Sequence, residues 1–162
     1  MPENPRASST PPEDQFVWWR FFVVSAVLIV LIPVLVYCAC MLLNGIGVVE
    51  TLQLTVHQMQ ADRRNLFLVG LPGVFPFLLL ALLIFVLRRR SGFTASRAVA
   101  LAGGGAIVLM LVWANASFWP VFLPGAAYPG WPHGLEMVIV PVFFAPIAML
   151  LDALLALIWS RR

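Results

Sequence analysis

The sequence has little charge and no lysine at all. Charged residues make up 10% of the 162 positions, all ten basic residues are arginine, and 62% of the residues are hydrophobic. A soluble domain is about 25% charged and about 45–50% apolar. A water-soluble core of this length has no room for so much apolar surface, so we expect lipid to cover part of it. The arginines form no basic surface interleaved with aromatic residues, which excludes a nucleic-acid partner.

Cysteine is equally scarce. The two cysteines, Cys38 and Cys40, lie inside an apolar stretch, which argues against a disulfide framework. Residues two apart on a helix point about 200° away from each other, so these thiols do not chelate one metal together. The stretch is longer than the roughly 7–15 residues of a signal-peptide core, and the acidic residues Glu13 and Asp14 precede it. The sequence therefore does not predict a cleaved signal peptide.

Long apolar segments dominate what is present. Crossing a hydrocarbon layer of about 30 Å takes about 20 helical residues, and backbone in lipid must satisfy its own hydrogen bonds. The segments lack the polar–apolar alternation of barrel strands. We therefore predict an all-α membrane protein with four transmembrane helices, at about residues 16–43, 66–87, 97–119 and 135–159.

The arginines also predict the orientation of these helices. Eight of them fall on one side of the predicted membrane and two on the other; the eight are Arg6, Arg20, Arg88, Arg89, Arg90, Arg97, Arg161 and Arg162, and the two are Arg63 and Arg64. By the positive-inside rule the eight-arginine side is cytoplasmic, which puts both termini there. The choice of arginine over lysine is typical of a GC-rich bacterial genome, so we expect the cell inner membrane. Residues 1–15, rich in proline, serine and acid, are predicted to be a disordered cytoplasmic tail ahead of a four-helix domain at 16–162.

The first predicted outer loop, residues 44–65, has two interpretations. It opens with Asn-Gly-Ile-Gly, a good helix stop. Apolar residues at helical spacing follow, namely Val48, Leu52, Val56 and Met59, and they predict an amphipathic helix lying on the outer membrane surface. Alternation with threonine and glutamine over residues 51–56 instead favours a strand. We prefer the helix, because the other outer loop offers a strand no obvious partner.

Asp152 is the one acid deep inside an apolar segment. It precedes Trp159 by seven residues, or about 10 Å along a helix. A carboxylate at the bilayer centre costs about 2.5–3.5 kcal/mol, so we expect Asp152 to face the bundle interior beside a partner, with Arg97 the nearest candidate. The pair has two interpretations: a structural contact or hydrated carboxylate, which we favour, or a proton- or cation-relay site.

Prolines and small residues mark the predicted helices. Prolines occur in three of the predicted helices, at Pro33, Pro72, Pro76, Pro141 and Pro146. We interpret them as kinks that help the helices pack. The alternative is that they mark unwound helix at a transporter binding site. Ala98, Ala102 and Ala106, with glycines at 103–105, give small-xxx-small spacing. That spacing predicts close helix packing, either within the bundle or against a partner subunit.

A few polar residues on the predicted outer side are weak candidates for a binding or catalytic site. His57, His133 and Glu136 have the chemistry to bind a metal or haem, or to act on lipid or quinone, but Glu136 also suits the dipole of a helix start. Asn115 and Ser117 are predicted to hydrogen-bond between helices. No phosphate-binding loop, zinc-protease or serine-hydrolase motif is present, so we expect no enzyme, cofactor or metal.

The hypothesis that best fits these features is a non-enzymatic accessory or assembly subunit of a larger membrane complex. Its expected partners are the lipid bilayer and either other membrane subunits or further copies of the chain. The main alternative is a small transporter or channel that uses Asp152 and the proline-kinked helices. A third is a membrane enzyme that works at the outer face.

Overall fold

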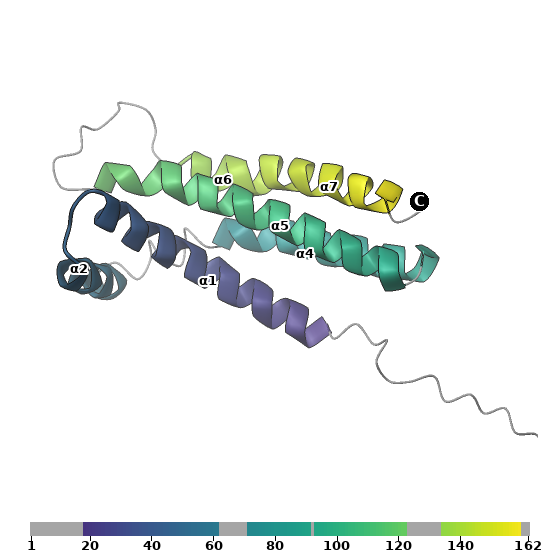
Figure 1. Cartoon of the computed structure of the whole chain (residues 1–162), viewed down its shortest axis with the longest axis horizontal. Helices are drawn as coiled ribbons and strands as arrows, with labels where there is room; N and C mark the ends of the chain where they lie inside the picture. The colour runs from purple at the N-terminus through teal and green to yellow at the C-terminus, as the bar shows by residue number, and fades with distance from the viewer. Residues whose placement is uncertain (1–17, 62–70, 92, 123–133, 160–162) are drawn as a thin grey trace, which may run out of the picture.

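The fold is that of a computed structural model, which describes residues 18–61, 71–91, 93–122 and 134–159. The predicted tail, the start of the second predicted helix, most of the second outer loop and His133 lie outside these ranges. Within them the chain forms helices and no strand (Figure 1).

Four helical stretches are long and apolar enough to cross a membrane, as predicted: Trp18–Leu43, Leu71–Arg88, Ser96–Phe118 and Glu136–Ile158. The first is α1 (Trp18–Leu43), and the second is a 3-10 turn, η2 (Leu71–Gly73), followed by α4 (Val74–Ser91). The third is α5 (Phe93–Phe118), which continues into η3 (Trp119–Phe122). The fourth consists of α6 (Glu136–Ile139), the π-helical turn η4 (Val140–Phe144) and α7 (Ala145–Trp159).

The helices of the second and third spans both extend past the apolar part of their sequence, into the segment that connects them. α4 continues through the arginine run to Ser91, and α5 begins at Phe93 rather than near residue 97. Arginine is a good helix former, so the helix need not end where the lipid does. The end of the apolar sequence therefore does not predict where a helix ends.

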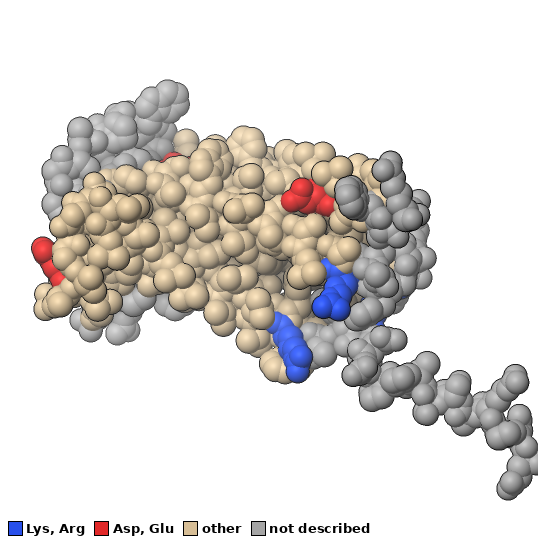
Figure 2. All heavy atoms as spheres, viewed as in Figure 1, with Lys and Arg blue, Asp and Glu red and all other residues tan. Residues whose placement is uncertain are grey.

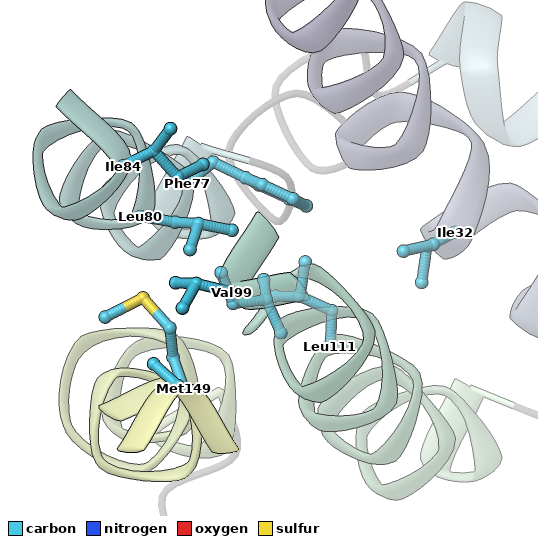
Figure 3. Packing of buried hydrophobic residues seen from close by; sticks show 9 residues of the cluster. Ile32, Phe77, Leu80, Ile84, Val99, Leu111 and Met149 are labelled. Atoms are coloured by element: carbon cyan, nitrogen blue, oxygen red, sulfur yellow. The ribbon is translucent and has the colours of Figure 1, made fainter. Parts of the chain in front are cut away.

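α5 is the central helix of the bundle. It packs most extensively on α7, then on α4, then on α1, while α4 also touches α1 and α7. The view along the helices in Figure 3 places α1 and α7 on opposite sides of the α4–α5 pair. The start of α1 and the end of α7 lie at the same end of the molecule (Figure 1), as four alternating crossings require.

A fully buried apolar cluster joins α4, α5 and α7. Leu80 and Ile84 of α4 meet Val99 of α5 and Met149 of α7, and none of the four is more than 2% exposed (Figure 3). Gly103 of α5 sits at this junction: a Cβ atom there would lie 2.9 Å from Leu80 Cδ1 and 3.1 Å from Met149 Cγ. Small size at this position lets the three helices approach closely.

The first outer loop contains a helix, α2 (Val48–Ala61), which rules out the strand interpretation over these residues. Gly45, whose φ is +82°, forms the turn that separates α1 from α2. α2 packs on α1 and runs across the bundle, so that Figure 1 shows it nearly end-on.

The prolines differ in their effect. Pro33 lies inside α1, which continues as an α-helix around it, and Pro76 lies in the first turn of α4, where its missing N–H is tolerated. Pro141 belongs to the π-turn η4, and the Ala145 N–H bonds to the Val140 carbonyl five residues back. The lost proline donor is thus accommodated by local widening of the fourth span.

Candidate functional site

Charge is segregated along the described part of the bundle. Arg20, Arg88 and Arg97 lie at the end where α1 and α5 begin and α4 finishes. Glu50 of α2 and Glu136 of α6 belong to the opposite end, and the surface between is overwhelmingly uncharged (Figure 2). An uncharged band between polar ends is what a hydrocarbon layer requires of a spanning protein.

Asp152 and Arg97 belong to α7 and α5, the two helices that pack most extensively on each other. Asp152 is partly exposed on α7 and Arg97 is exposed near the start of α5. No hydrogen bond or ion pair joins them, and neither has such a bond to another residue that the structure describes. On α5, Arg97 is four residues from the exposed Leu101, whereas α7 packs through Met149 near Gly103, on a different side of that helix. The role of Asp152 stays a prediction.

The outer-side candidates belong to separate elements. His57 is exposed on α2, which packs on α1, while Glu136 is half-buried at the start of α6, which packs on α5. His133 falls outside the described ranges. Glu136 is in the first turn of its helix, the position favoured by the helix dipole. Among the described side chains no three metal-ligating groups come together.

A polar pair is buried where α5 passes into η3. The Trp119 indole Nε1–H donates to Asn115 Oδ1 over 3.0 Å, and Asn115 Nδ2 donates to the Leu111 carbonyl over 2.8 Å. Both side chains are nearly inaccessible, at 2% for Asn115 and 1% for Trp119. The Tyr37 ring of α1 meets the Trp119 ring edge-on, with centroids 5.0 Å apart. The pair and this ring contact hold the end of α5 that leads into η3 against α1.

The prediction that Asn115 and Ser117 hydrogen-bond between helices was wrong. Ser117 Oγ donates to the Trp113 carbonyl over 3.0 Å, and both bonds of Asn115 stay within α5 and η3. Short polar side chains in helices readily bond the carbonyl four residues back. The sequence signal for the buried pair was the four-residue spacing of Asn115 and Trp119, which places them on one helix face.

A polar seam joins α1 and α2. Cys38 Sγ lies 3.3 Å from Thr55 Oγ1, and that hydroxyl donates to the Thr51 carbonyl over 2.7 Å. Thr51 is 2% exposed, and its hydroxyl is the one buried side-chain oxygen or nitrogen in the described structure with no hydrogen-bond partner. α2 therefore turns Thr51 and Thr55, together with the partly buried Leu54, toward the protein. No pattern in the sequence predicted which residues of α2 would pack on α1.

A stripe of three apolar residues of α2 points outward. Val48, Leu52 and Val56 are 64%, 56% and 51% exposed. A soluble protein normally buries such a stripe against its core. Here the stripe remains free to meet lipid or another chain.

Compared with known proteins, the chain matches no family model, no curated protein and no solved structure. Arguments about function therefore rest on the chain's own residues.

Proposed function

We propose that the protein is a non-enzymatic accessory or assembly subunit that sits in the cell inner membrane and contributes helix surface to a larger complex. The observation that carries this proposal is the open outer face of α5. Leu101 and Leu109 are each 69% exposed there, and Gly105 between them has nothing within 4 Å of where a Cβ would stand. A glycine between two exposed leucines, each one turn away, lets a further helix approach the backbone closely.

The proposed orientation places both termini in the cytoplasm. Its support is the basic end of the bundle, which carries Arg20, Arg88 and Arg97 beside the start of α1 and the end of α7 (Figure 2). Arginine flanking short loops is retained on the cytoplasmic side. The end that carries α2 then faces outward.

In this orientation α2 is an interfacial helix with three faces. Thr51 and Thr55 contact the protein, while Val48, Leu52 and Val56 are exposed and apolar, and a third set is exposed and polar: Glu50, Gln53 and His57. At 100° per residue the threonine and apolar sets are centred about 80° apart, and the polar set lies about 130° from the apolar set and about 150° from the threonines. A helix lying in the membrane plane beside a bundle meets three surroundings: protein, hydrocarbon and water. Each face of α2 suits one of them.

Cysteine scanning tests this placement of α2. In a Cys38→Ala, Cys40→Ala background, we expect a membrane-impermeant maleimide to label cysteines at Gln53 or His57 at least about tenfold faster than cysteines at Leu52 or Val56. The reason is that the reactive thiolate is disfavoured in apolar surroundings. The background protein without added cysteine is the control for the reagent. Equal rates at all four positions would contradict the interfacial placement.

Site-specific photo-crosslinking in native membranes tests the proposed subunit role. A photoreactive residue in place of Leu109 is expected to give one discrete adduct, whose mass identifies either a second copy or a different subunit. The same residue in place of Leu154, an equally apolar and 56% exposed position on α7, is the matched control and should give none. Gly105→Leu should abolish the adduct while leaving thermal stability unchanged. The proposal would be refuted if no adduct formed at position 109, or if the adduct still formed in the Gly105→Leu variant.

Nothing specific favours the transporter alternative over this role. Asp152 has no hydrogen-bonded neighbour among the described residues, whereas a relay chain passes protons between adjacent polar groups. The proline-linked π-turn of the fourth span is packed against α5 and α4.

A further inference from the structure

An apolar groove runs between α4 and α7 on the outside of the bundle. It has a volume of about 270 Å³ and is lined by Leu79, Leu82, Leu83 and Val86 of α4 and by Met149 and Leu150 of α7. Met149 is buried, while Leu82, Val86 and Leu150 are 59%, 42% and 53% exposed. The groove exists because α4 and α7 each pack more closely on α5 than on one another.

The groove is short enough to lie within one membrane leaflet. From Leu79 to Val86 the helix rises about 10 Å, and one leaflet contributes about 15 Å of hydrocarbon. These residues form the half of the Leu71–Arg88 span that is next to its arginine end. A partner helix would need a groove that continues through both leaflets. An acyl chain needs only one, so the groove fits a lipid chain.

The end of the groove is basic. α4 continues to Ser91, so the three consecutive arginines, Arg88, Arg89 and Arg90, belong to its last turn, just beyond Val86. Cationic residues at this depth attract anionic headgroups, at about 1 kcal/mol for each residue near the membrane surface. A lipid whose chain occupies the groove therefore places its phosphate at the positively charged end of α4.

We propose that the α4–α7 groove is a binding site for an anionic phospholipid of the leaflet on the arginine side. One acyl chain lies against Leu82, Leu83 and Leu150, and the headgroup lies at the arginine run that ends α4. The lining selects for an apolar chain and the arginines select for negative charge. This site is on a different face from the open side of α5, so it does not depend on the proposed subunit role.

Native mass spectrometry of the delipidated, purified full-length protein tests the site with defined lipids. Phosphatidylglycerol is expected to bind as a single first adduct about tenfold more tightly than phosphatidylcholine of the same chain length. Leu83→Phe, which narrows the groove, should weaken binding of both lipids. Arg89→Gln combined with Arg90→Gln should reduce phosphatidylglycerol binding to the phosphatidylcholine level and leave phosphatidylcholine unaffected.

Two matched variants keep the result interpretable. Leu35→Phe adds the same bulk at a 56% exposed position of α1, and Arg20→Gln removes a charge from the same end of the molecule but from another helix. Both should bind phosphatidylglycerol like the unmodified protein, and helicity by circular dichroism should be equal in all variants. Equal affinity for the two lipids refutes the headgroup site, and unchanged binding in Leu83→Phe refutes the groove. If Leu83→Phe alone loses helicity, Leu82→Phe, which adds bulk at a 59% exposed position of the groove lining, must also lower affinity.

Discussion

Substituting valine for Gly103 is expected to cost more stability than any other change of similar size in the described bundle. Even the Cβ atom would lie 2.9 Å from Leu80 Cδ1 and 3.1 Å from Met149 Cγ, and these neighbours are only 0% and 2% exposed. Neither side chain has free space to move into, so α5 must separate from α4, from α7 or from both. Overpacking of this kind costs about 1–3 kcal/mol or more. Reversible unfolding by denaturing detergent in mixed micelles measures the loss.

Gly105→Val is the matched control for this prediction. It makes the same substitution half a turn away on the same helix, but at a site with nothing within 4 Å. Valine is a better helix former than glycine by a few tenths of a kcal/mol, so stability should be unchanged or slightly raised. Equal destabilisation by the two substitutions would mean that the three-helix junction at Gly103 does not hold the bundle together.

The contrast between these two glycines shows where the sequence was informative. Length and hydropathy predicted four long apolar helices, because both quantities are set by the thickness of the hydrocarbon layer. The small residues of the third span correctly indicated a packing surface. Which of its glycines packs was not predictable, since Gly103 and Gly105 have equivalent sequence surroundings but opposite burial.

The same limit applies to the apolar side chains. Leu80 is fully buried and Leu82 is 59% exposed, although both are leucines in one uninterrupted apolar run. In water the hydrophobic effect would impose a 3.6-residue period on such a helix, but lipid is as apolar as the core and removes that constraint. The sequence therefore predicts how many helices cross the membrane and not which faces meet. For the same reason it did not predict that Thr51 and Thr55 of α2 pack toward α1.

Asn115→Leu is the second substitution for which we expect a large effect. Leucine has the same branched arrangement of side-chain heavy atoms as asparagine and suits an apolar bundle, so hydropathy alone predicts a gain in stability. The structure predicts a loss, because the Trp119 indole N–H, in a side chain 1% exposed, would have no acceptor. An unsatisfied buried donor costs about 1–3 kcal/mol. Detergent-induced unfolding should show this loss.

A double-mutant cycle separates that hydrogen bond from simple repacking. With Trp119→Phe already in place no indole donor remains, so adding Asn115→Leu should cost markedly less than it does alone, by about 1 kcal/mol or more. Ser117→Ala is the control for the carbonyl bond: it removes a bond of 3.0 Å to the backbone of α5, but at an exposed site, and should change stability by less than about 0.5 kcal/mol. An equal cost of Asn115→Leu in both backgrounds would show that Trp119 draws no stability from Asn115. In that case apolar and aromatic packing, including the contact of Tyr37 with Trp119, would hold the end of α5 that leads into η3.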